Sequence, residues 1–189
     1  IRYSAAMEDL FNRYDGDPEI AALYAESVMD LYPWNLYDKE GEAREWTPKV
    51  IVLLEEVIKD FPDHPGAHHF YIHATEASNT PERALGSAKR FDEGLVPGAG
   101  HLLHMPSHTY IQTGDYHKGS LANIRAVERD SAYVTLCHAQ GAYPLVYYPH
   151  NYHFLAATAT LEGNSNWALM GAEKLAEKIH PDIMTEPGW

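Results

Sequence analysis

Three histidines lie within eight residues of the stretch HLLHMPSHTY, which covers positions 101–110. His101, His104 and His108 follow one another at spacings of three and four residues. Residues with these spacings share one face of a helix, so their imidazoles can bind a single ion. Neutral imidazole suits transition metals, whereas calcium and magnesium require more carboxylate oxygens. The stretch therefore predicts a transition-metal site, provided that a helix holds it.

The chain is rich in histidine and tyrosine, and the histidines are not evenly spread. Eight of its 12 histidines fall in three short clusters. The first contains His68, His69 and His73, the second is the stretch above, and the third contains His150 and His153. A spacing of four residues recurs between His69 and His73, as it does between His104 and His108. Chemistry at these clusters depends on which elements bring them together.

Composition excludes several classes of partner and limits the architecture. At 189 residues with 45% apolar residues, the chain is long enough to bury a core. A net charge of -13 argues against nucleic acid and anionic membranes as partners. No apolar run approaches the roughly 20 residues of a membrane span. A single cysteine, Cys137, rules out an internal disulfide and a multi-cysteine zinc site.

The compartment stays open, because the redox argument does not decide it and no signal peptide is visible. The chain begins at Ile1 rather than at a methionine, and we expect it to be a fragment of a larger protein.

Helix-type periodicity dominates the sequence, and strand-like alternation is hard to find. We expect a diverged pair of helices over residues 1–31, a loop over 32–46 and a helix over 47–62. Further helices follow, joined by short connections. Overlaying PERALGSA (81–88) on YHKGSLAN (116–123) gives an internal offset of 35 residues, which indicates a repeat.

The segment from Gly100 carries small and aromatic residues at regular places along this repeat. They are Ser107, Tyr110, Gly114, Tyr116, Gly119 and Ala126. This pattern resembles the 34-residue unit of the tetratricopeptide repeat (TPR) family. We assign TPR-like units to residues 65–99, 100–134 and 149–180, with an inserted loop over 135–148. Pro106 departs from the pattern, because its ring clashes with a helical carbonyl, so the helix either starts near Leu103 or kinks.

The resemblance implies an all-α, right-handed helical-repeat solenoid of antiparallel helix pairs, one array whose first helices line a concave groove. In this frame the fifth position of three successive units is His69, His104 and His153. Only His68, among the clustered histidines, falls on a packing position instead. The predicted metal ligands are His69, His73, His101, His104, His108, His150 and His153. Further candidate groove residues are Glu26, Glu76, Tyr110 and Tyr152.

The sequence therefore favours a TPR-like scaffold that binds one or two transition metal ions among these histidines. Copper, zinc and iron are not distinguishable, and the protein is either a metal carrier or an oxidative or hydrolytic centre. Two alternatives stay open. One is a metal-free module that binds a protein or peptide in the groove, and the other is a structural subunit of a larger assembly. Catalysis, catalytic residues and oligomeric state are not decided by the sequence.

Overall fold

The computed structural model describes residues 2–179 and divides into two compact units, Ile1–Arg90 (unit 1) and Phe91–Trp189 (unit 2). Its described elements are helices, and extended pairing is limited there to an isolated bridge between Tyr37 and Ala43. The predicted all-α class is confirmed. Among the described residues, no helix combines the length and the apolar character needed to cross a bilayer.

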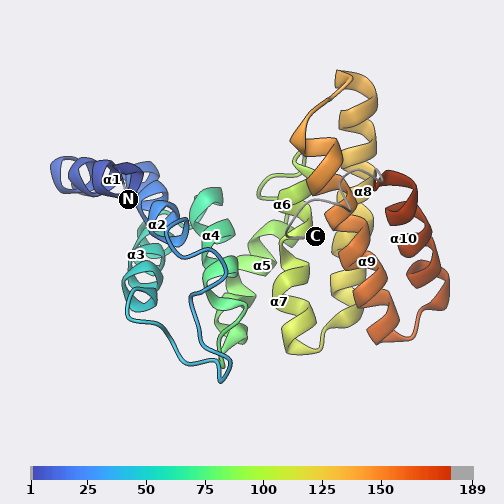
Figure 1. Ribbon diagram of the computed structural model, residues 1–189, viewed down its shortest axis with the longest axis horizontal. Coiled ribbons are helices and arrows are strands. Elements are labelled where there is room, and N and C mark those ends of the chain that lie inside the picture. Colours follow the sequence, from blue (N-terminus) through green and yellow to red (C-terminus); the bar gives the residue numbers. More distant parts are fainter. Residues whose placement is uncertain (1, 180–189) are drawn as a thin grey trace. The chain divides into compact units, whose positions relative to one another are not determined.

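Unit 1 is built from successive helices that pack on their neighbours (Figure 1). They are α1 (Arg2–Arg13), α2 (Pro18–Met29), α3 (Thr47–Asp60), α4 (Pro65–Thr75), the short 3-10 helix η1 (Pro81–Ala84) and α5 (Leu85–Asp92), which continues to the start of unit 2. Val50, Leu54 and Ile72 are at most 1% exposed and form part of the core. The buried aliphatic residues of α3, which include Val50 and Leu54, form one stripe along the helix that faces this core.

Unit 2 contains the remaining helices (Figure 1). They are α6 (Gly100–His104), α7 (Pro106–Thr113), α8 (Tyr116–Cys137), the π-helix η2 (Tyr143–Tyr147), α9 (Tyr148–Glu162) and α10 (Ser165–Lys178). Helix α8 packs against α6, α7 and α9, and α9 packs against α10. The loop expected over 135–148 is partly helical, since α8 extends to Cys137 and η2 begins at Tyr143. Pro144 lies in the first turn of η2. Proline is tolerated at this place in η2, since the first N–H groups of a helix have no helical partner.

The helix of the HLLHMPSHTY stretch is interrupted at Met105, one residue before Pro106. Met105 keeps helical dihedral angles (φ -49°, ψ -37°), so the chain continues in the same general direction. Proline lacks the N–H that would bond to the carbonyl four residues earlier. The structure thus shows an interrupted helix rather than a later start. His101 and His104 lie on α6, and His108 lies on α7.

The core of unit 2 contains a buried polar network around Asp130 of α8. Its carboxylate accepts hydrogen bonds from Tyr143 Oη at 2.6 Å and from Asn151 Nδ2 at 2.7 Å. Burial raises the pKa of Asp130, while these two hydrogen bonds lower it. Gly100 of α6 makes room for the carboxylate, because a Cβ there would lie 1.9 Å from Asp130 Oδ1. Asp130 therefore joins α8 to η2 and α9.

Gly171 allows α9 and α10 to approach closely, and its replacement tests this packing. A Cβ at Gly171 would lie 2.8 Å from the backbone nitrogen of Ala156 and 3.1 Å from the carbonyl oxygen of Tyr152. No side-chain rotation relieves a contact with backbone atoms. We expect Gly171→Ala to lower the free energy of unfolding by about 1–3 kcal/mol, measured by urea denaturation.

Gly86→Ala in α5 is the matched control, because a Cβ at Gly86 meets nothing within 4 Å. This change is expected to be neutral or to stabilise by up to about 1 kcal/mol, since alanine favours helix more than glycine does. Equal effects of the two substitutions would rule out the close approach as the cause.

Candidate metal centre

His104, the last residue of α6, is fully buried in unit 2. Its Nδ1 lies 2.7 Å from Asn123 Oδ1 and 3.1 Å from Ser107 Oγ. The amide nitrogen of Asn123 donates to the Gly119 carbonyl at 2.9 Å, so the amide oxygen faces His104. His104 Nδ1 therefore carries the proton and donates it. Its Nε2 is left with an in-plane lone pair.

Two further imidazole nitrogens converge on that lone pair. His108 Nε2 lies 2.9 Å from His104 Nε2, and His150 Nε2 lies 3.1 Å from it. The three nitrogens all lie within 4.8 Å of one another. A neutral imidazole nitrogen has one lone pair, so it cannot accept two strong hydrogen bonds along the same direction. A metal ion placed among the nitrogens accepts a lone pair from each ring instead.

Phe154 of α9 packs against all three rings of the cluster. Its ring centroid lies 4.8 Å from His104, 4.4 Å from His108 and 4.8 Å from His150. This aromatic contact and the surrounding core exclude water from His104. Burial, reinforced by the neighbouring His108 and His150, lowers the pKa of His104 well below its usual value. His104 is therefore neutral at pH 7, which is the form that binds metal.

The position of His150 follows from the polar network of unit 2. His150 lies in the first turn of α9, and the next residue, Asn151, is hydrogen bonded to Asp130. Asn151 is fully buried, so this bond fixes the start of α9 against α8. Helix α8 also carries Asn123, the partner of His104. One helix thus positions two of the three imidazoles.

Three of the five predicted ligands in unit 2 come together, namely His104, His108 and His150. His101 lies beside them, with its ring 5.7 Å from that of His104 and 4.9 Å from that of Tyr147. His153 is exposed on α9 and lies outside the cluster.

Within unit 1 the predicted ligands His69 and His73 lie side by side on α4. Their ring centroids are 4.9 Å apart, as the spacing of four residues predicts. His73 Nδ1 lies 2.9 Å from the carboxylate of Glu76. Such a carboxylate contact orients a histidine that binds metal through its other nitrogen. His68 is buried against Ser87 and Pro62, in agreement with the packing position that the repeat gave it.

The other candidate groove residues have local partners. Glu26 accepts a hydrogen bond from Tyr3 Oη at 2.9 Å, and burial raises its pKa. Tyr110 is 4% exposed, and its hydroxyl donates to Asp92 at 2.5 Å. Tyr152 is 9% exposed and packs in a cluster with Tyr148 and Leu155. Both tyrosines therefore belong to the interior of unit 2.

Sequence reasoning missed the residues that support the three imidazoles, above all Asn123, Asp130 and Phe154. The sequence does contain a signal for Asn123 and Asp130. Asn123 and Asp130 stand seven residues apart, which is about two helical turns, so they share one face of α8 with the buried Ala126. Polar residues on a buried helical face require partners.

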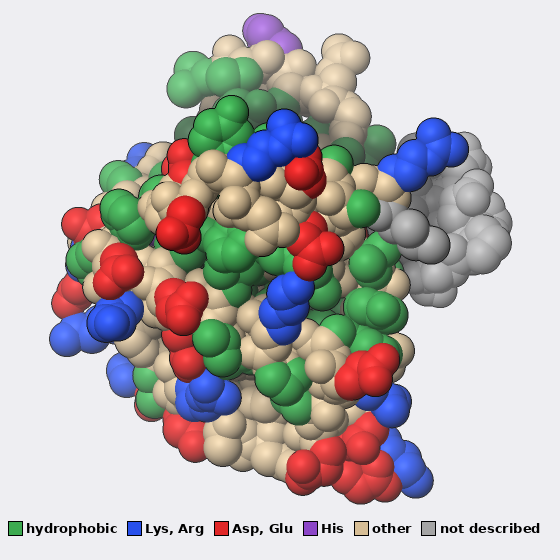
Figure 2. Space-filling view, turned by 90° about the vertical axis from the view of Figure 1, so that its left-hand side faces the viewer, with side chains coloured by type: hydrophobic (Ala, Val, Ile, Leu, Met, Phe, Trp, Pro, Cys, Tyr) green, Lys and Arg blue, Asp and Glu red, His purple; other side chains and the backbone are tan. Residues whose placement is uncertain are grey.

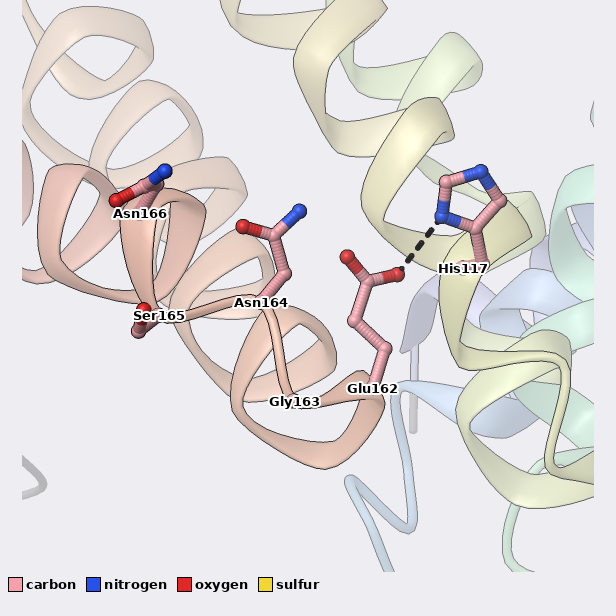
Figure 3. Close-up of a pocket in the computed structure, with 6 residues that line it drawn as sticks. All are labelled: His117, Glu162, Gly163, Asn164, Ser165 and Asn166. Carbon is pink, nitrogen blue, oxygen red and sulfur yellow. Dashed lines mark hydrogen bonds and ion pairs between the residues drawn. The ribbon is translucent and has the colours of Figure 1, made fainter.

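A shallow pocket at the turn between α9 and α10 is a different kind of feature (Figure 3). It is lined by His117, Glu162, Gly163, Asn164, Ser165 and Asn166. His117 Nδ1 lies 3.0 Å from a Glu162 carboxylate oxygen, and the Asn164 side chain caps α10. With one histidine in its lining, this pocket lacks the convergence of imidazoles seen at His104.

No protein-family model matches the chain, and no curated protein matches it. The structure is similar to MamA 41-end from Desulfovibrio magneticus RS-1, with a TM-score of 0.64 and 12% sequence identity. That match covers 97% of this chain and 85% of the other. The MamA RS-1 ArsTM double mutant gives a TM-score of 0.64 at 13% identity, covering 92% and 82% respectively. At such identities the likeness shows the fold alone, which is a TPR-like helical repeat.

Proposed function

We propose that the chain is a TPR-like scaffold that binds a transition metal ion through His104, His108 and His150. The observation that carries this proposal is the convergence of two Nε2 atoms, at 2.9 and 3.1 Å, on the lone pair of His104 Nε2. The hydrogen bond to Asn123 sets the tautomer that leaves this lone pair available.

The ligand set suits copper, zinc or iron, because imidazole binds all three. Three protein ligands leave a further coordination position for an exogenous group, which is the pattern of catalytic rather than closed structural zinc sites. An ion with such a position acts as a Lewis acid or activates water. Metal carriage and a metal-dependent centre are therefore both compatible with the ligand set. His69 and His73, oriented by Glu76, are candidates for a second ion in unit 1.

Replacing one ligand tests the site. For protein purified without an affinity tag, we expect His104→Ala, His108→Ala and His150→Ala each to weaken binding of zinc or copper at the unit 2 site by at least ~100-fold. Calorimetric titration measures the affinity, and elemental analysis measures the metal content.

Two histidines outside the cluster provide the controls. His153→Ala and His117→Ala are expected to leave the affinity unchanged, because both side chains are exposed and neither belongs to the cluster. If wild-type protein and all variants bind metal equally weakly, the proposal fails. The metal-free peptide-binding module then becomes the favoured function.

Asn123 is a positioning residue, and its loss should affect metal affinity without removing a ligand. We expect Asn123→Ala to weaken metal binding by about 10- to 100-fold, because His104 loses the acceptor that sets its tautomer. Thermal unfolding of the metal-free variant serves as the control for fold. Unchanged affinity in a folded variant would show that the tautomer of His104 is set by another group.

Acid should destabilise the metal-free protein in a way that depends on His104. In the unfolded chain this histidine takes up a proton below about pH 6.5, whereas its lowered pKa keeps it neutral in the folded state. The unfolded state then binds more protons, so the free energy of unfolding falls as pH drops below about 6.5. The uptake of one proton lowers the free energy of unfolding by at most about 1.4 kcal/mol per pH unit.

Urea denaturation at pH 7.5, 6.5 and 5.5 measures this dependence. His104→Gln removes the titrating group, so we expect a shallower loss of stability below pH 6.5 than in the wild type. If the free energy of unfolding falls equally with pH in the two proteins, the proton uptake does not occur at His104.

A further inference from the structure

A long segment of the chain carries no charged side chain. Residues 131–161 contain no Asp, Glu, Lys or Arg, although the whole chain has 27 acidic and 14 basic residues. In a soluble protein a buried helix explains such a run, because charged residues are rarely buried. The second half of this segment, in α9, fits that explanation, since it contains Leu155 and Ala159 of the core.

The first half of the segment is exposed, so burial does not explain its lack of charge. Large apolar side chains project into solvent from the end of α8 and from η2. These residues, which we call the apolar tip, are Tyr133, Leu136, Leu145, Val146 and Tyr147, exposed by 45, 79, 43, 41 and 42%. In Figure 1 the end of α8 and the following turn project beyond the other helices of unit 2. The projection at the top of Figure 2 shows hydrophobic side chains and a histidine, without a visible charged side chain.

The size and shape of the apolar tip argue against a stable protein interface. Specific interfaces use about 20–30 residues on each side and bury about 800 Å² per partner. Five side chains on a convex projection fall well short of that number, and a protein partner would need a matching concavity. A fluid lipid surface has no such requirement, because it adapts to the shape that enters it.

The residue types match the chemistry of a lipid interface. Tyrosine is enriched where headgroups meet acyl chains, and leucine and valine favour the acyl side of that boundary. The five residues of the tip lie in α8 and η2, where backbone polar groups bond within the helix, as insertion requires. With a net charge of -13 the chain is repelled by anionic headgroups. A zwitterionic lipid surface is therefore the better match for the tip.

We propose that the apolar tip inserts into the headgroup region of a zwitterionic phospholipid surface and docks unit 2 there. This inference does not depend on metal binding. Interfacial elements of this kind are buried by about 5–10 Å. The exposed Cys137 follows Leu136 directly and is the chain's single cysteine, so it can carry a reporter without other changes to the sequence.

The test is flotation of the unlabelled chain with phosphatidylcholine vesicles, together with fluorescence of a polarity-sensitive dye on Cys137. We expect the protein to float with the vesicles and the dye emission to shift to the blue. Leu136→Glu combined with Val146→Glu should lower the partition coefficient by about tenfold or more. Leu161→Glu combined with Leu169→Glu, at side chains exposed by 52 and 63%, should leave it unchanged.

Three outcomes would overturn the proposal. In the first, the wild-type protein stays unbound or the tip variant floats equally well. In the second, binding requires anionic phosphatidylglycerol in the vesicles. In the third, the blue shift follows protein concentration without vesicles, which would show that a second copy of the chain covers the tip. Circular dichroism of both double variants checks that they are folded.

Discussion

The hydrogen bond from His104 Nδ1 to Asn123 Oδ1 decides what the histidine cluster can do. A buried neutral imidazole has two tautomers, and they present opposite properties to a neighbour. With the proton held on Nδ1, Nε2 can only accept, and two other imidazole nitrogens face it at hydrogen-bonding distance. Asn123 is itself fixed by its bond to Gly119, so the arrangement is set one helical turn away from the cluster.

The polar core of unit 2 supports this arrangement from a second side. Asp130, Asn151 and Asn123 are all fully buried, and burial of such groups is costly unless they are bonded. Their hydrogen bonds join α8 to η2 and α9 with defined directions. Apolar packing tolerates small slips between helices, whereas these bonds do not. The register of α9, and with it the place of His150, therefore depends on polar contacts rather than on apolar packing alone.

Much of the fold follows from periodicity and from the repeat, because each helix pair is a local unit that packs on its neighbours. The pairing of His104 with His108 follows from a spacing of four residues. The contact of these two with His150 could be predicted only from the repeat, since 46 positions separate His150 from His104 in the sequence.

The repeat did not predict the geometry before α9. A π-helix precedes α9 directly, and π-helices have a wider turn than the α-helix that the repeat assumes. His150 meets His104, whereas His153 faces solvent. Asn123 and Phe154 had no motif of their own, because their roles exist only after the helices are packed.

The separation of His104 from His150 along the chain has a consequence for stability. An ion shared by these residues is a cross-link that closes a loop of 46 residues. Closing such a loop removes conformations from the unfolded ensemble, by the same reasoning that applies to a disulfide. A chain with one cysteine cannot make an internal disulfide. Coordination would then give unit 2 a reversible cross-link that acid or a chelator opens, and with a redox-inactive ion such as zinc a reductant would leave it closed.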